Sequence, residues 1–232
     1  MTMFDGLIST VTIFGADLLR NIKGIRESQD LFDDLGESSE DYMVAIATEC
    51  RDILPSDQGA ITRPFYYGTV LTYPFIQENW QQTRFSSGID YGVWYGSLDL
   101  ETTIYETTYH WRRLVVDSFA HKSLEIKADQ RVLKVKCQGI IISLLGKEVE
   151  WPAITDPNDY TFTNALGAYV KQQNQNGLLV KSARCQGTNA AIFTPDILSD
   201  ARDYCFLSYI FSPADKTRIR VEREPGKLFM TV

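Results

Sequence analysis

Apolar side chains recur in the first part of the chain at steps of three and four residues. This spacing is typical of an amphipathic helix and predicts one over residues 4–25. A second helix is predicted after the polar run at 27–36, capped by Ser38 or Ser39 and stopped by Pro55. The apolar positions of the two are Leu7, Val11, Phe14, Leu18, Ile22 and Ile25, then Met43, Ile46, Ala47, Cys50 and Ile53. We therefore predict a helical N-terminal appendage over residues 1–58, which either packs on the main domain or serves dimerisation or partner docking.

The remainder, residues 59–232, alternates between strand and helix patterns. Aromatic, β-branched or alternating runs predict strands, and runs of helical spacing predict helices beginning at Asp99 and spanning 160–173. The strand runs are RPFYYGTVL from about Pro64, GVWYGS at 92–97, RVLKVKCQG at 131–139, GLLVKSARC at 177–185, NAAIFTP at 189–195, and a terminal hairpin around Pro225-Gly226. No βαβ rhythm repeats. The predicted class is α+β, with a mixed or antiparallel sheet and flanking helices.

Composition narrows the function classes. The 232 residues are 44% hydrophobic and carry a net charge of −7, which fits a globular domain and disfavours non-specific nucleic-acid binding. The four cysteines lie far apart and there are only two histidines, so neither a metal site nor a disulfide framework is expected. We interpret His110 and His121 as helix-surface or helix-end residues. With no signal peptide or membrane span in the pattern, we expect a cytoplasmic protein without direct membrane contact.

The candidate chemistry lies in Arg84, Tyr95 and Glu106, which are equally spaced, and in Ser182 at the end of a predicted strand. An arginine offers a planar fork to phosphate oxygens, and a phenol can stack on a heterocycle. A carboxylate can stabilise an oxocarbenium-like centre while a glycosidic bond breaks. Each residue is also compatible with a structural role, so the residues alone reach only the hypothesis of a nucleotide-sugar pocket.

These residues resemble the motifs of the RES domain, named for arginine, glutamate and serine and found in toxins of bacterial toxin–antitoxin pairs. The first motif matches Arg84 in TRFSSG, Tyr95 in VWYGS and Glu106 in ETTIYE. The second matches Ser182 in LLVKSARC, followed by the strand TNAAIFTP. Arg63 in ITRPFYY matches a further family arginine. RFSSG replaces the family's glycine-rich, Trp-containing loop, and Lys181 replaces its usual proline.

The resemblance implies a fold similar to ADP-ribosyltransferases and diphtheria toxin, with a cleft that binds NAD. It implies destruction of NAD at the nicotinamide–ribose bond by hydrolysis or phosphorolysis, with NAD as substrate and no cofactor or metal. Arg84 and Arg63 would then hold the phosphates, and Tyr95 would stack near the nicotinamide. Glu106 would stabilise the cationic ribose, and Ser182 would bond the ligand or orient Glu106.

The same resemblance implies a partner, an Xre-type antitoxin with a helix-turn-helix, whose C-terminal end blocks the cleft in the family. Two alternatives stay open. One is a protein-directed ADP-ribosyltransferase, although Ile104 stands where such enzymes often carry a second acidic residue. The other is a degenerate, non-enzymatic binding module. A homodimer also remains open.

Overall fold

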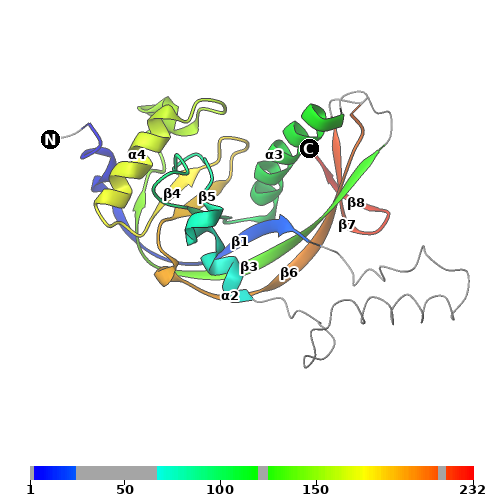
Figure 1. Ribbon diagram of the computed structural model, residues 1–232, viewed down its shortest axis with the longest axis horizontal. Helices are drawn as coiled ribbons and strands as arrows, with labels where there is room; N and C mark the ends of the chain where they lie inside the picture. The colour runs from blue at the N-terminus through cyan, green and yellow to red at the C-terminus, as the bar shows by residue number, and fades with distance from the viewer. Residues whose placement is uncertain (1–2, 25–66, 120–124, 214–217) are drawn as a thin grey trace, which may run out of the picture.

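A single mixed sheet of eight strands organises the chain in the computed structural model, which describes residues 3–24, 67–119, 125–213 and 218–232 (Figure 1). The strand order is β1-β2-β5-β4-β3-β6-β7-β8, and every neighbouring pair is antiparallel except β3 and β4. The predicted α+β class with a mixed sheet is confirmed. The strands are β1 (Val11–Lys23), β2 (Trp94–Ser97), β3 (Ile126–Ser143), β4 (Gly177–Lys181), β5 (Thr188–Ile192), β6 (Leu198–Phe211), β7 (Ile219–Glu224) and β8 (Lys227–Thr231).

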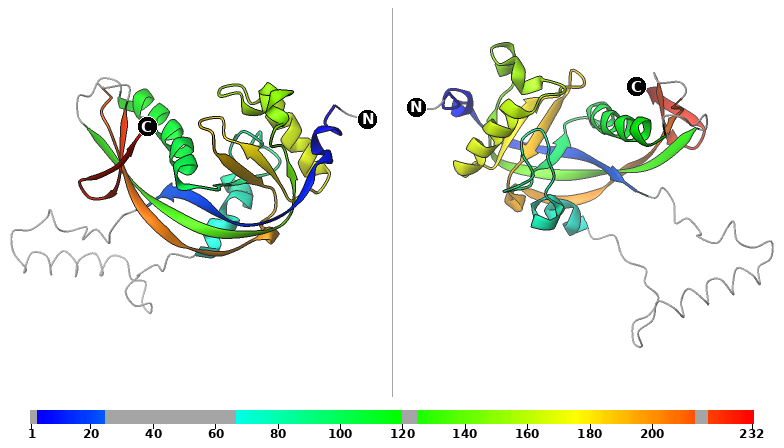
Figure 2. Two further views of the ribbon diagram at one scale, coloured as in Figure 1. Left: turned by 180° about the vertical axis from the view of Figure 1, so that it is seen from behind. Right: turned by 45° about the horizontal axis from the view of Figure 1, so that its top comes forward.

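The helices lie on this sheet at separate places. They are α2 (Tyr67–Thr72), α3 (Leu100–Phe119) and α4 (Thr161–Gln172), with 3-10 turns η1 (Leu7–Ser9), η2 (Tyr73–Phe75), η3 (Gln77–Asn79), η4 (Lys147–Val149), η5 (Pro152–Thr155) and η6 (Pro195–Ile197). Figures 1 and 2 show α3 and α4 on the same, concave side of the curved sheet, α3 toward β7 and β8 and α4 toward β4 and β5. None of the described helices is long and apolar enough to cross a membrane.

One end of the sheet closes on itself because β1 pairs with both β2 and β3. The β1–β3 ladder runs without interruption from the pair Val11 and Ile142 to the pair Lys23 and Gln130. Strands β1, β2, β5, β4 and β3 therefore form a ring, and one buried cluster takes side chains from all five. Its members include Phe14, Leu18, Trp94, Val135, Cys137, Ile141, Leu179, Ala190 and Ile192.

Two further buried clusters attach the helices. The first packs Ile104, Trp111 and Val115 of α3 against β3, β6 and β7. The second packs Leu166 and Val170 of α4 against β4, β5 and the segment before β2. Each of the two helices therefore has its own core.

The predicted helix over residues 4–25 is wrong: this segment forms η1 and the strand β1. The spacing of Phe14 and Leu18 fits a helix, but in the strand these side chains enter the ring core while Leu19 enters the α3 core. A strand with a core on each face lacks the simple alternation that identifies half-exposed strands. This part of the predicted appendage is thus a strand of the main sheet, and the second predicted helix lies outside the described residues.

The strand predicted from about Pro64 is also wrong over residues 67–72, which form α2. Aromatic and β-branched residues favour strands only where a neighbouring strand pairs with them. Here the carbonyl of Val70 instead accepts a hydrogen bond from Trp94 Nε1 at 3.1 Å. The other predicted strands, the two helices and the C-terminal hairpin are present within a few residues of their expected bounds.

A pair of alanine substitutions tests which side chains of β1 are buried. Leu18 is 0% exposed and Ile13 is 89% exposed. Leu18→Ala should lower the free energy of unfolding by about 2–5 kcal/mol, since it leaves a cavity in the ring core. Ile13→Ala should change it by less than about 0.5 kcal/mol. Denaturant unfolding measures both, and equal losses in the two variants would contradict the strand register.

Candidate functional site

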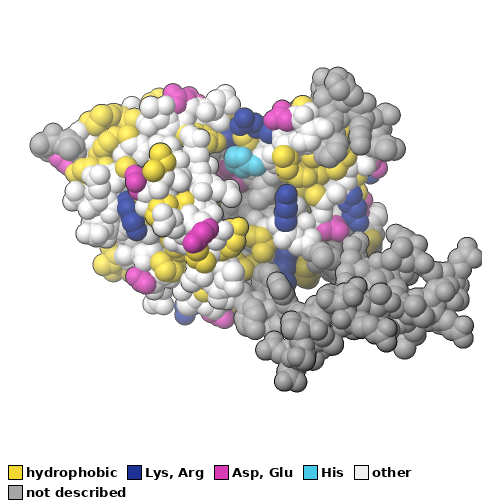
Figure 3. Space-filling view, in the orientation of Figure 1, with side chains coloured by type: hydrophobic (Ala, Val, Ile, Leu, Met, Phe, Trp, Pro, Cys, Tyr) yellow, Lys and Arg dark blue, Asp and Glu magenta, His cyan; other side chains and the backbone are white. Residues whose placement is uncertain are grey.

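A cavity of about 570 Å³ opens between α3, the strands β1, β2 and β5, and the segment before β2. Figure 3 shows the molecule hollowed here, with blue basic side chains and a cyan histidine at the hollow. Its lining includes Arg20, Asn21, Gln81, Gln82, Thr83, Arg84, Phe85, Tyr95, Gly96, Ser97, Thr103, Glu106, Thr107, His110, Tyr160, Val180, Lys181 and Asn189. Three of the five predicted site residues, Arg84, Tyr95 and Glu106, therefore meet at one cavity.

Glu106 lies on the second turn of α3, on the face opposite the α3 core. The helix begins where Asp99 caps it, since Asp99 Oδ1 accepts a hydrogen bond from the Thr102 backbone N–H at 2.7 Å. Ile104 is 0% exposed in the core. Because residues two apart on a helix point in widely different directions, burial of Ile104 turns Glu106 toward the cavity.

The carboxylate of Glu106 is held by two neutral donors that address the same oxygen. Ser182 Oγ donates to Glu106 Oε1 at 2.6 Å, and Asn189 Nδ2 donates to it at 2.7 Å. Glu106 Oε2 has no hydrogen-bond partner among the described residues. One oxygen is therefore anchored, and the other stays available to a ligand.

Each of the two donors is fixed by its own strand. Ser182 follows β4, and its Oγ accepts the backbone N–H groups of Arg184 and Cys185 at 3.0 and 3.3 Å, so its proton is directed to Glu106. Asn189 on β5 pairs with Ser97 on β2, whose Oγ donates to Asn189 Oδ1 at 2.7 Å. Ser182 does not line the cavity. Of the two roles that the sequence left open for Ser182, the geometry favours orienting Glu106.

Arg84 is held by backbone carbonyls and an aromatic ring. Its Nη1 donates to Ile154 O at 3.3 Å and to Asp156 O at 2.8 Å, and its guanidinium lies 4.7 Å from the Tyr160 ring centroid. Burial lowers the pKa of Arg84, while Tyr160 and Glu106 act in the opposite direction. The guanidinium stays charged at neutral pH, and it forms no ion pair with Glu106.

Tyr95 presents its ring to the cavity and fastens its hydroxyl to the segment that carries Arg84. The hydroxyl donates to Thr83 Oγ1 at 2.9 Å and accepts the Phe85 backbone N–H at 3.0 Å. Burial raises the pKa of Tyr95 well above its ordinary value of 10.0, so the phenol is neutral. This tyrosine therefore also braces the loop of Arg84.

Further cavity residues escaped the sequence predictions. Arg20 of β1 donates to Tyr95 O at 3.1 Å and lies 5.0 Å from the Trp94 ring centroid, and burial lowers the pKa of Arg20 to about 10. Lys181, at the end of β4, lies 4.0 Å from a carboxylate oxygen of Glu148. Arg20 could have been found only by reading residues 11–23 as a strand. Asn189 belongs to the strand motif TNAAIFTP, but no sequence pattern predicts its contact with Glu106.

The cavity is cationic although the whole chain is acidic. Among its described lining residues, Arg20, Arg84 and Lys181 are positive, and Glu106 is the one carboxylate. Cations around a cavity attract phosphate groups, and a single carboxylate facing them can stabilise a cationic carbon. Arg63 lies outside the described residues, so its predicted role stays a prediction, as do the ligand contacts of the other four.

The comparison with family models agrees with the motifs. The sequence matches the family model described as RES domain over residues 58–212. The chain belongs to the RES family. A chain of the crystal structure of the M. tuberculosis MbcT–MbcA toxin–antitoxin complex is similar to this chain, with 11% sequence identity and a TM-score of 0.48. The match covers 91% of this chain and 95% of that chain. No curated protein matches the sequence.

A glycine beside the Ser182 loop offers a test of how that loop is positioned. A Cβ on Gly187 would lie 1.6 Å from Thr102 Oγ1 and 2.7 Å from Thr102 Cβ, so this loop packs directly on the start of α3. Gly187→Ala should cost about 1–3 kcal/mol of unfolding free energy, because the loop or the helix must shift. Thermal and denaturant unfolding measure the loss.

The matched control is Gly15→Ala in β1, where nothing lies within 4 Å of an added Cβ. Its stability should be unchanged or slightly raised, since an alanine restricts the unfolded chain. A Gly187→Ala protein as stable as Gly15→Ala would show that the close packing of loop and helix is absent.

Proposed function

We propose that this protein is a RES-type toxin that depletes NAD by cleaving the nicotinamide–ribose bond, as a glycohydrolase or a phosphorylase. The observation that carries the proposal is the Glu106 carboxylate, anchored through Oε1 by Ser182 and Asn189 at the wall of a cationic cavity. NAD is the substrate in this proposal, and no cofactor or metal takes part.

The chemistry asks little beyond positioning and charge. The nicotinamide of NAD is already cationic, so it leaves as a neutral molecule without a proton donor. The ribose carbon becomes cationic as the bond lengthens, and a fixed carboxylate lowers the energy of that state. Glu106 suits this role because neutral groups hold it, so no cation of the protein neutralises its charge.

The remaining lining residues suit the rest of the dinucleotide. Two phosphates carry negative charge at neutral pH, and Arg20, Arg84 and Lys181 supply positive charge in the cavity. The rings of Tyr95 and Tyr160 also line the cavity and suit stacking against a heterocycle. These features support an anionic ligand with a flat ring, and they support the roles proposed for Arg84 and Tyr95.

A toxin of this kind requires neutralisation. We propose a cognate antitoxin as partner, of the Xre type with a helix-turn-helix, that blocks the cavity. The similar MbcT chain was solved as a toxin–antitoxin complex, and the RES family membership supports the same arrangement here. The proposal places the protein with its antitoxin in the cytoplasm.

Transfer of ADP-ribose to a protein is the competing reaction. Ile104 occupies the place where an arginine-directed transferase often has a second acidic residue, and it is fully buried. This favours degradation of NAD over transfer. A discrete labelled band after incubating lysate with labelled NAD would instead favour the transferase.

The decisive variant is Glu106→Gln, which keeps the size of the side chain and removes the charge. Its rate of NAD consumption and nicotinamide release should fall by about 100-fold or more, because the cationic ribose loses its stabilising carboxylate. The assay is run with and without phosphate, to separate hydrolysis from phosphorolysis.

Glu101→Gln is the control, since Glu101 is an exposed glutamate on the same helix. It should consume NAD at the wild-type rate, and both variants should unfold at the wild-type temperature. A wild-type protein that leaves NAD intact with and without phosphate would refute the proposed function.

A further inference from the structure

The cavity face of α3 holds more than Glu106. Thr103, Glu106, Thr107 and His110 all line the cavity at steps of three and four residues, so they form one stripe along the helix. Glu106 is half-buried, whereas His110, one turn further on, is exposed. The stripe therefore runs from the anchored carboxylate to an imidazole at the cavity mouth.

The imidazole of His110 makes no hydrogen bond with the described residues. Its ring packs edge-on against the Tyr109 ring, with centroids 5.3 Å apart. Structural histidines usually fix at least one ring nitrogen through a hydrogen bond. Here both nitrogens are left for solvent or for a molecule in the cavity.

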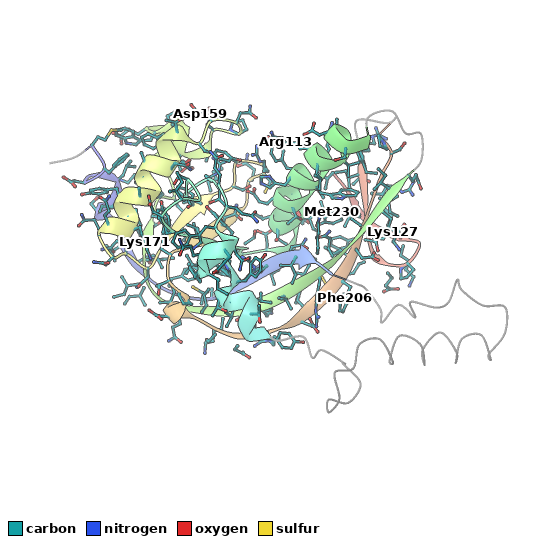
Figure 4. All side chains as sticks on the ribbon, viewed as in Figure 1. Arg113, Lys127, Asp159, Lys171, Phe206 and Met230 are labelled. Atoms are coloured by element: carbon teal, nitrogen blue, oxygen red, sulfur yellow. The ribbon has the colours of Figure 1, made fainter. Side chains whose placement is uncertain are left out.

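The surroundings of His110 favour its neutral form. Although His110 is exposed, partial burial of its imidazole at the cavity wall lowers the pKa of His110 below its ordinary 6.5, and the positive charges of Arg184, Arg113 and Arg84 act in the same direction. Glu106 acts in the opposite direction. Figure 4 labels Arg113 on α3 and Asp159 just before α4. At neutral pH the imidazole is therefore in the form that can accept a proton, and the Glu106 carboxylate favours its protonation.

We propose that His110 accepts the proton of the molecule that captures the ADP-ribosyl group, an inference that rests on the proposed function. The acceptor is an oxygen nucleophile with an O–H bond, and it enters from the mouth where His110 lies. Glu106, deeper on the same stripe, stabilises the cationic ribose. The two side chains one helical turn apart thus divide the reaction between them.

The step balances without a further reagent. The bond between ribose C1′ and the nicotinamide nitrogen breaks, and its electron pair neutralises the pyridinium, so nicotinamide leaves without gaining a proton. A new bond forms between C1′ and the acceptor oxygen. The proton of that oxygen passes to the free nitrogen of His110 and from there to solvent.

This division of roles separates two measurable reactions. Cleavage followed by recapture of nicotinamide needs no proton acceptor, and it appears as exchange of labelled nicotinamide into NAD. Net consumption of NAD requires capture by the O–H acceptor. His110→Gln should therefore lower consumption at pH 7 by about 100-fold while exchange stays within about threefold of wild type. Glu106→Gln should lose both reactions.

The pH dependence gives a second readout. Only the neutral imidazole accepts a proton, so wild-type consumption should fall as the pH drops from 7 toward 5 and His110 becomes charged. Glu106, Arg84, Arg113, Arg184 and the neighbouring Tyr109 remain in the variant. In His110→Gln, the decrease in NAD consumption that results from protonation of His110 should be absent. Glu101→Gln, at an exposed position on the same helix outside the cavity lining, is the control and should match wild type in both reactions.

The outcomes are distinct. A His110→Gln protein with wild-type consumption and an unchanged acid fall would overturn the inference alone. A parallel loss of consumption and exchange would also overturn it, because His110 would then act on bond cleavage or on folding, and the unfolding temperature tells these apart. A wild-type protein that neither consumes NAD nor exchanges nicotinamide would refute the proposed function, and the inference would fail with it.

Discussion

The two hydrogen bonds to Glu106 Oε1 join α3 to residues that lie 76 and 83 positions further along the chain. Ser182 reaches the carboxylate from the end of β4, and Asn189 reaches it from β5. The orientation of each donor is fixed, because backbone N–H groups bind the Ser182 hydroxyl and Ser97 binds the Asn189 amide. If α3 moved relative to β4 and β5 by even about 1 Å, both bonds would exceed hydrogen-bonding distance. The placement of α3 on the sheet is therefore the constraint on which the site depends.

The closed end of the sheet provides that placement. Strands β2, β4 and β5 have only four or five residues each, and short strands are weakly held by their own ladders. The long strands β1 and β3 pair with each other along thirteen positions and complete the ring around them. The ring core then fixes the edge at which Ser97, Ser182 and Asn189 meet. Since α3 packs on β3, β6 and β7 through a separate core, the site forms where the two packed units touch.

The parts of this arrangement that the sequence predicted are those encoded locally. The step from β2 to α3 was predictable because Asp99 is an N-cap and the apolar spacing after it is helical. The strands that carry Ser182 and Asn189 were predictable because each is a short run of apolar residues in the sequence. The strand β1 was not, because a strand with a core on both faces can place its apolar residues at helical spacing. Arg20 was missed along with it. The contacts of Arg84 with Ile154 and Asp156 join segments that are distant in sequence, so no local sequence pattern predicts them.

How an acidic chain maintains a cationic cavity follows from what its arginines contact. On the outer surface Arg131, Arg202 and Arg220 pair with carboxylates of Asp203, Asp200 and Glu125. In and beside the cavity, Arg20, Arg84 and Arg184 are instead held by main-chain carbonyl oxygens and aromatic rings.

A carbonyl or a ring orients a guanidinium without cancelling its charge, whereas a carboxylate would neutralise it. Glu106 is likewise held by neutral groups, since a hydroxyl and an amide donate to it and no cation pairs with it among the described residues. Apart from Lys181, which lies near Glu148, these charges of both signs are thus fixed in position without neutralising one another. This condition is what a site needs to bind an anionic ligand and stabilise a cationic carbon within it.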